Sequence, residues 1–132
     1  MNDAATQRDR WLRSANEDVT YAQVARGANY HAPACFHAQQ AAEKAVKAIH
    51  YGRGARVVIG HNVRALIEAL VPAVAALTTL LDDARDLDVF YIPTRYPNGL
   101  ESGTPGEAFG PQQSARALAA ADAILTAARS SR

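Results

Sequence analysis

Several features that define whole classes of protein are missing from this 132-residue sequence. It has a single cysteine, Cys35, which excludes an intrachain disulfide framework and is typical of a reducing compartment. No apolar run reaches the roughly 18 residues that a membrane-spanning helix needs, and the polar first residues do not resemble an export signal. We therefore expect a cytoplasmic protein that does not enter a membrane.

An excess of charge of one sign is also missing. The sequence contains 14 basic and 13 acidic residues, which leaves a formal net charge of +1. A protein with a nearly neutral overall field attracts nucleic acid or an anionic membrane only through a local patch of charge. The function must therefore be sought in the arrangement of individual side chains.

Strict alternation of polar and apolar residues is absent over any useful length, and the apolar residues recur instead at every third or fourth position. This period predicts amphipathic helices, and the length is that of a single domain, residues 1–132, with one core. The predicted fold class is all-α, an antiparallel up-and-down bundle of four long helices plus one short helix. The expected helices cover about residues 6–28, 33–51, 62–70 and 72–88, and the last begins at about residue 112.

Proline and glycine are scarce except in one segment. Between Phe90 and Pro111 lie four of the six prolines and four of the eight glycines, which excludes a continuous helix there. We predict a long ordered loop before the last helix. Within it, Pro93 and Pro97 restrict the backbone on both sides of Arg95, so the loop loses less entropy on ordering than a glycine-rich loop would.

The second expected helix carries polar residues on an otherwise apolar face. Gln39, Glu43 and His50 share this face with Phe36 and Val46, at steps of three or four residues. A buried carboxylate is costly without a partner, so Glu43 needs a cation or several hydrogen-bond donors if the face is buried. We predict that this cation is Arg95. The alternative is a half-exposed face on which Glu43 is solvated.

Arg95 is also the best candidate for contact with a ligand. A guanidinium group binds a carboxylate or a phosphate through paired hydrogen bonds, and the neighbouring tyrosine rings are faces on which a base could stack. The alternative is a structural clasp, in which Arg95 pairs with Glu43 and the tyrosines pack over the end of the bundle. The candidate ligand-binding residues are Arg95, Tyr96, Tyr91, Lys44, Lys47 and Glu43, with His37, His50, Arg53 and Arg56 as secondary candidates.

Three stretches together resemble the HEPN domain family. They are QQAAEKAVKAI in the second expected helix, GHNVRALIEAL at the start of the third, and YIPTRYPNGLESGTPGEAF before the last. The resemblance covers about residues 6–129 and points to the branch with an RYP motif before the last helix. It implies a helical bundle that dimerises, nucleotide or RNA binding, and a minimal nucleotidyltransferase as the partner in a toxin–antitoxin-like pair.

Some members of the family that this sequence resembles are metal-independent ribonucleases, in which an arginine is followed after four to six residues by a histidine. No histidine follows Arg95, so the motif is absent from its expected place. Arg56 and His61 match the spacing, but they lie in the connector before the third helix, and we interpret this match as a coincidence. A ribonuclease would then need Arg95 to act with His37 or His50 across a dimer.

The sequence indicates neither a metal nor a cofactor. Its four histidines lack the four-residue spacing of helical zinc motifs, and no glycine loop ends in the lysine and hydroxyl residue of a P-loop. We interpret His61 as a residue that hydrogen-bonds the backbone at the start of its helix. Besides binding and cleavage, a third hypothesis is a helical adaptor without a ligand.

Overall fold

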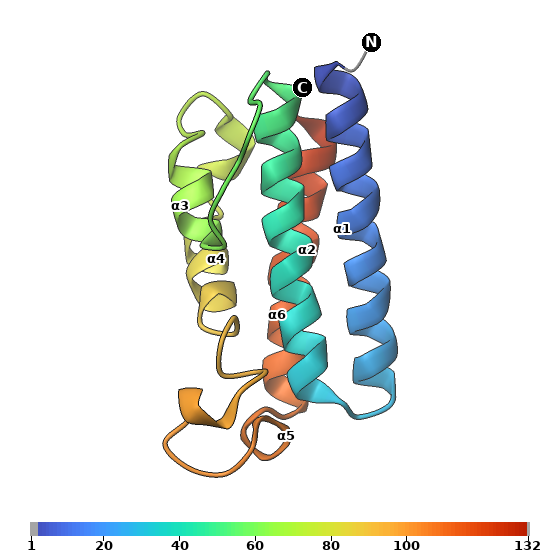
Figure 1. Cartoon of the computed structure of the whole chain (residues 1–132), viewed down its shortest axis with the longest axis vertical. Helices are drawn as coiled ribbons and strands as arrows, with labels where there is room; N and C mark the ends of the chain where they lie inside the picture. Colours follow the sequence, from blue (N-terminus) through green and yellow to red (C-terminus); the bar gives the residue numbers. More distant parts are fainter. Residues whose placement is uncertain (1–2, 132) are drawn as a thin grey trace.

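The computed structural model describes residues 3–131 (Figure 1). Three long and three short α-helices form this part of the chain, and no strand occurs in it, so the predicted all-α bundle is confirmed. The helices are α1 (Ala4–Gly27), α2 (His31–Gly52), α3 (Val63–Glu68), α4 (Leu81–Asp88), α5 (Pro105–Ala108) and α6 (Pro111–Ser130), with 3-10 turns η1 (Ala75–Leu77) and η2 (Pro97–Gly99).

The three long helices lie side by side along the length of the molecule (Figure 1). Helix α2 runs antiparallel to α1 and in the same direction as α6, and it contacts both. Helices α3 and α4 pack against α2 on the side away from α1, and the loop that contains η2 and α5 lies at one end of the bundle. Helix α2 is therefore the central helix, and most of its residues are buried.

Local signals account for the ends of the first two helices. The side chain of Asp3 accepts a hydrogen bond from the backbone N–H of Thr6 at 2.8 Å, which caps α1. After Gly27 the chain turns at Asn29, whose φ of 67° suits asparagine better than most residues. Helix α2 begins two residues earlier than predicted, so that Pro33 lies in its first turn, where a missing N–H costs nothing.

Most of the buried residues of the long helices are alanines. A methyl side chain lets two helix backbones approach closely, and larger apolar residues from α3, η1 and α4 complete the core beside them. The fully buried alanines of the long helices are Ala15 and Ala22 of α1, Ala34, Ala38, Ala41, Ala42, Ala45 and Ala48 of α2, and Ala117, Ala121 and Ala128 of α6.

The helix predicted for residues 72–88 forms only in its second half. Before α4, the backbone N–H groups of Leu77 and Leu80 bond to carbonyls three residues earlier, which gives η1 and a turn instead of an α-helix. The two β-branched residues Thr78 and Thr79 fall at this break, and such side chains lose rotamer freedom in a helix. The apolar period alone did not reveal this interruption.

Candidate functional site

The buried face of α2 holds a carboxylate. Glu43 is only 5% exposed, so the alternative of a solvated side chain is wrong. Its Oε2 atom accepts a hydrogen bond from Nζ of Lys47 at 3.0 Å and lies 3.2 Å from Nδ1 of His61. Lys47 is buried as well. These two partners offset the cost of removing the carboxylate from water.

Two glutamines connect this cluster to the segment between α2 and α3. Gln39 is fully buried, and its Nε2 donates to the backbone carbonyl of His61 at 3.0 Å. Gln40 donates in turn to Oε1 of Gln39 at 2.7 Å. The amides therefore hold the connector, residues 53–62, against the polar face of α2, and they place the His61 ring beside Glu43.

Arg95 is not the partner of Glu43, and our prediction of that ion pair is wrong. Lys47, one turn further along α2, reaches the carboxylate instead, as residues four apart on a helix can. The Arg95 guanidinium lies over aromatic rings, a contact that attracts its positive charge and matches its planar shape. The ring centroids lie 4.7 Å (Phe36), 4.5 Å (Tyr91) and 5.1 Å (Tyr96) from its Cζ atom.

The contacts of Arg95 fix its position without neutralising its charge. Its Nε donates to the backbone carbonyl of Tyr91 at 2.9 Å. Among residues 3–131, no carboxylate forms an ion pair with the guanidinium. Through the ring of Phe36 on α2, the side chain also attaches the loop to the bundle. Arg95 is therefore an oriented cation whose charge this part of the chain does not compensate.

Tyr91 joins Arg95 to the Glu43 cluster. Its ring stacks on the His61 ring, with centroids 4.9 Å apart and an interplanar angle of 17°. The His61 side chain is 57% exposed, although its Nδ1 faces the buried carboxylate. Our interpretation of His61 as a backbone-binding residue is therefore wrong for its ring, and the cap of α3 is Asn62. The structure places Arg95, Tyr91, His61 and Glu43 in one row of contacts.

Asp88 of α4 holds the chain just after His61. Its carboxylate accepts hydrogen bonds from the N–H groups of Val63 at 2.7 Å and Arg64 at 2.9 Å, at the start of α3. Burial raises the pKa of the Asp88 carboxyl above its ordinary value, and the like charge of Glu43 adds to this, although the two N–H groups and the Arg64 charge act in the opposite direction. Asp88 thus anchors the start of α3, which follows His61 in the chain.

Sequence reasoning missed a second buried carboxylate, Asp18 of α1, which is 4% exposed. Its Oδ1 lies 2.8 Å from Nδ1 of His37, and its Oδ2 lies 2.7 Å from Nζ of Lys44, as an ion pair without the alignment of a hydrogen bond. A signal was present, because Asp18 follows Ala15 by three residues and precedes Ala22 by four, and it therefore shares their buried face.

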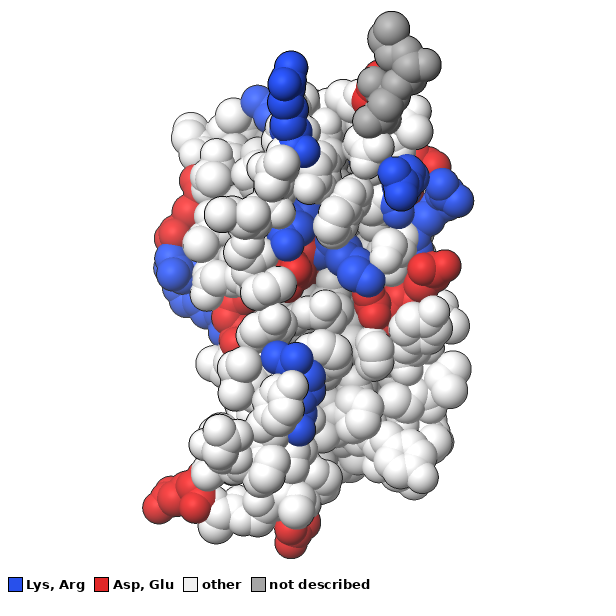
Figure 2. All heavy atoms as spheres, viewed as in Figure 1, with Lys and Arg blue, Asp and Glu red and all other residues white. Residues whose placement is uncertain are grey.

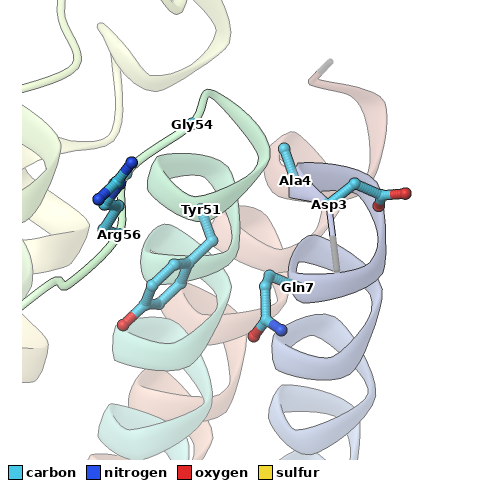
Figure 3. A pocket seen from close by; sticks show the side chains of 7 residues that line it. Asp3, Ala4, Gln7, Tyr51, Gly54 and Arg56 are labelled. Atoms are coloured by element: carbon cyan, nitrogen blue, oxygen red, sulfur yellow. The ribbon is translucent and has the colours of Figure 1, made fainter. Parts of the chain in front are cut away.

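A hollow opens between the start of α1 and the end of α2. It has two adjoining parts of about 430 and 440 Å³, and both are lined by Gln7, Tyr51 and Arg56. Figure 3 shows Gln7 on α1, Tyr51 on α2 and Arg56 on the connector. In the second part, the Trp11 ring stacks on that of Tyr51, with centroids 5.2 Å apart, and Arg10 adds another guanidinium group.

The other secondary candidates lie elsewhere. Nε2 of His50 is 2.9 Å from the backbone carbonyl of Leu66, so this ring ties α2 to α3. Arg53 lines a separate, smaller hollow together with Ser131. Of the two basic residues predicted in the connector, only Arg56 therefore joins the aromatic hollow.

Charged side chains are unevenly distributed over the face seen in Figure 2. Most of the blue and red atoms lie over the half of the bundle that contains the start of α1 and the end of α2, whereas the other half is mainly uncharged apart from a separate basic group and two acidic groups at its end. Within residues 3–131, no group of three or more histidine, cysteine or acidic side chains is arranged to hold a metal ion. No helix in the same range is both long enough and apolar enough to cross a bilayer.

The long helices α1, α2 and α6, with short helices on one side, define a small all-helical domain. Inside it, two buried carboxylates each pair with a lysine. A family model for the HEPN domain matches residues 9–131, and the chain belongs to this family. The family resemblance seen in the sequence is thus confirmed.

The solved structures that are similar to the chain include TT1696 and ST0689. TT1696 from Thermus thermophilus is 36% identical, with a TM-score of 0.88 over 93% of this chain and 96% of that chain. ST0689, described as an archaeal HEPN homologue, is 30% identical, with a TM-score of 0.76 over 98% of this chain and 97% of that chain. A comparison with curated proteins gave no match.

Proposed function

We propose that this HEPN domain binds RNA or nucleotides, with the Arg95 guanidinium as the phosphate contact. One observation carries this proposal: Arg95 is held over three rings and has no carboxylate partner among residues 3–131. A cation that is already oriented loses little entropy when an anion binds to it. Guanidinium also matches the geometry of two phosphate oxygens.

The residues around Arg95 support this assignment in different ways. Tyr96 is 50% exposed and lies beside the guanidinium, so its ring can stack on the base attached to a bound phosphate. Tyr91 is less available, because it is already stacked, and it positions Arg95. The charge of Glu43 is offset by Lys47, which reduces its repulsion of a phosphate.

A binding measurement tests the proposal. The probe is a fluorescein-labelled oligouridylate of eight nucleotides, followed by fluorescence anisotropy at low salt. Arg95→Ala should weaken binding at least tenfold. Arg13→Ala is the matched control, since Arg13 is an exposed arginine of α1 that pairs with Asp9, and it should leave the affinity within about twofold. Unchanged affinity of folded Arg95→Ala would refute the phosphate contact.

The clasp and adaptor hypotheses make a different prediction. Phe36→Leu removes one ring from beneath the guanidinium and leaves its charge in place. If Arg95 serves only to attach the loop, Phe36→Leu and Arg95→Ala should both lower the melting temperature, and the RNA affinity of the folded fraction should not change. That result would support an adaptor without a ligand. If Arg95→Ala loses RNA affinity and Phe36→Leu does not, the result supports a binding site at Arg95.

A second candidate function is metal-independent RNA cleavage, and the contact between His61 and Glu43 favours it. The carboxylate holds Nδ1, while the side chain is 57% exposed, so that Nε2 is left to exchange a proton with a substrate. His50 differs in this respect, because its Nε2 faces a carbonyl. The Nδ1 of His37 also faces a carboxylate, that of Asp18, but the His37 side chain is only 33% exposed.

In this reaction Nε2 of His61 accepts the proton of a ribose 2′-hydroxyl, and the 2′-oxygen attacks the neighbouring phosphorus. The bond from phosphorus to the 5′-oxygen breaks, the 5′-oxygen takes a proton from water, and a 2′,3′-cyclic phosphate forms. Purified protein would be incubated with total RNA in excess chelator. Cleavage that is lost in His61→Asn and retained in His50→Asn would support the reaction. No cleavage by the unaltered protein would refute it.

We also propose that the domain belongs to the RYP branch, forms a homodimer and associates with a minimal nucleotidyltransferase in a cytoplasmic toxin–antitoxin-like pair. The segment YIPTRYPNG and the family membership support this. Val57 and Ile59 of the connector, 76% and 82% exposed, offer apolar surface to another chain. Light scattering of the purified protein and co-purification with the co-expressed product of a neighbouring nucleotidyltransferase gene would test both associations. A monomer that retains no such partner would contradict them.

A further inference from the structure

We propose that the hollow between α1 and the end of α2 is a second nucleotide subsite, so that the domain holds one segment of single-stranded RNA between Arg95 and Arg56. The inference rests on the proposed binding of RNA at Arg95, and it specifies the form of the RNA. The charges, the rings and the position of the hollow each contribute to the argument.

The charges in the hollow suit phosphate. Arg10 and Arg56 are both exposed and line its second part, and neither forms an ion pair with a carboxylate of residues 3–131. Lys44 adds a third cation, although Asp18 neutralises much of its charge. Two uncompensated guanidinium groups from different segments thus face one hollow. Phosphate groups would bind there and release counterions.

The rings in the hollow suit an unpaired base. Trp11 and Tyr51 are half-buried and stacked, with an interplanar angle of 22°, and Nζ of Lys47 lies 5.8 Å from the Trp11 centroid. A stack of two side chains can be extended by a base, because every base has a flat face. The second part of the hollow, about 440 Å³, lies within the usual range of ligand pockets.

The hollow and Arg95 lie on the same side of α2. Lys47 contacts both Trp11 and Glu43, and from Glu43 the row of contacts continues through His61 and Tyr91 to Arg95. The rings at the two ends, Tyr51 and Phe36, lie 15 positions apart on α2, which corresponds to roughly 22 Å along the helix axis. A single nucleotide cannot occupy both ends, whereas a strand of several nucleotides can.

The chemistry of this path favours a single strand over a duplex. Stacking on Trp11 or Tyr96 requires a base with a free face, and bases inside a duplex have none. Alternating cations and aromatic rings are the usual means of binding single-stranded nucleic acid without sequence preference. Two of the carboxylates near the path, Glu43 and Asp18, are each paired with a lysine, which limits their repulsion of phosphate. A third, Asp3, lines the first part of the hollow and accepts a hydrogen bond from the backbone N–H of Thr6, whereas the second part, with Arg10 and Trp11, has no carboxylate from residues 3–131 in its lining.

Two measurements on the full chain test the proposal. Trp11 is the only tryptophan, so its fluorescence reports directly on the hollow. Oligouridylates of two and eight nucleotides and a blunt RNA duplex of eight base pairs would be titrated against the unaltered protein and three variants: Arg10→Ala/Arg56→Ala, Arg95→Ala and the control Arg13→Ala. The eight-nucleotide strand should bind at least tenfold more tightly than the dinucleotide and the duplex, and it should quench Trp11.

The double variant should lose about tenfold in affinity for the eight-nucleotide strand and keep the affinity for the dinucleotide, which occupies the Arg95 end. Equal affinity of the double variant and the unaltered protein for the long strand, with binding still lost in Arg95→Ala, would refute the second subsite and leave the proposed function intact. If neither the unaltered protein nor any variant binds RNA, both the second subsite and the proposed function are refuted. If polyglutamate quenches Trp11 to the same extent, the hollow is a surface that binds acidic peptides, and the proposal is overturned.

Discussion

The Nδ1 atom of His61 lies 3.2 Å from Oε2 of Glu43, although 18 positions separate the two residues. This contact joins the connector to the central helix at a carboxylate that the bundle has removed from water. It also orients the exposed edge of the imidazole ring. The same carboxylate is bound by Lys47, so the stability of the bundle and the position of His61 depend on one side chain.

Replacing Glu43 by glutamine should lower the free energy of unfolding by about 3 kcal/mol, because Lys47 is then buried without a counter-charge. Urea unfolding followed by circular dichroism measures this change. An exposed pair provides the control. Asp9→Asn removes the contact with Arg13 on the surface of α1 and should cost less than about 1 kcal/mol.

A second variant separates lost charge from lost packing. In Glu43→Gln/Lys47→Met no charge is left unpaired, so at least half of the lost stability should return. If Glu43→Gln and Asp9→Asn lower the free energy of unfolding by the same amount, the buried pair of Glu43 and Lys47 matters no more for stability than an exposed pair. No recovery in the double variant would show that the packing of Glu43, and not its charge, matters.

The sequence could predict the long helices because local signals mark them. Asp3 caps α1, which begins two residues before the predicted start, and α6 begins one residue before its predicted start, at Pro111. The segment before α4 was harder to predict, because its apolar residues keep the period of a helix while the chain turns at Thr78. Periodicity reports which residues are buried, and it does not report a break between two short elements on the same face.

The candidate site could be predicted only in part. The helical period placed Glu43 on an otherwise apolar face without deciding whether that face is buried. Burial implies that Glu43 has a partner, but nothing in the sequence distinguishes between Arg95, Lys47 and His61 as that partner. Their distances depend on the path of two loops. The aromatic rings beside Arg95 were in the sequence, but their role as its support emerges only when Phe36 of α2 is placed below the loop.

Asp88→Ala should lower the free energy of unfolding by about 1 kcal/mol, because the N–H groups of Val63 and Arg64 lose their acceptor at the start of α3. It should also loosen the chain beside His61. Amide hydrogen exchange of residues 61–68 measures that local effect, with α6 as the internal reference. Equal increases in exchange in α3 and α6 would contradict a local anchor.

Cys35 should give the stability a specific dependence on alkaline pH. Burial raises the pKa of its thiol from 9.0 to about 11, so the unfolded chain loses this proton at lower pH than the folded chain. The contribution of the protonated Cys35 thiol to the free energy of unfolding is complete below pH 9 and is lost as the pH rises towards 11. The free energy of unfolding of Cys35→Ala, measured with urea, should fall less steeply with pH between pH 9 and 11 than that of the unaltered protein. Parallel pH profiles of the two proteins would contradict the assignment.

Gly52→Ala should destabilise the bundle, although alanine favours helix by up to about 1 kcal/mol over glycine. An added Cβ atom would lie 2.8 Å from Cδ and 3.2 Å from Cβ of Arg8. Arg8 cannot simply move away, because its Nη2 donates to the carbonyls of Ala128 and Ser131 at the end of α6. We expect a loss of about 1–2 kcal/mol in urea unfolding.

The effect of Gly52→Ala should change sign when Arg8 is absent. In an Arg8→Ala background the clash disappears, and the intrinsic preference of alanine for helix should make Gly52→Ala neutral or stabilising. Gly27→Ala is the matched control, since Gly27 also ends a long helix and a Cβ atom there would meet nothing within 4 Å. A loss of stability by Gly52→Ala that is the same in both backgrounds would place the conflict in the helix backbone and not at Arg8.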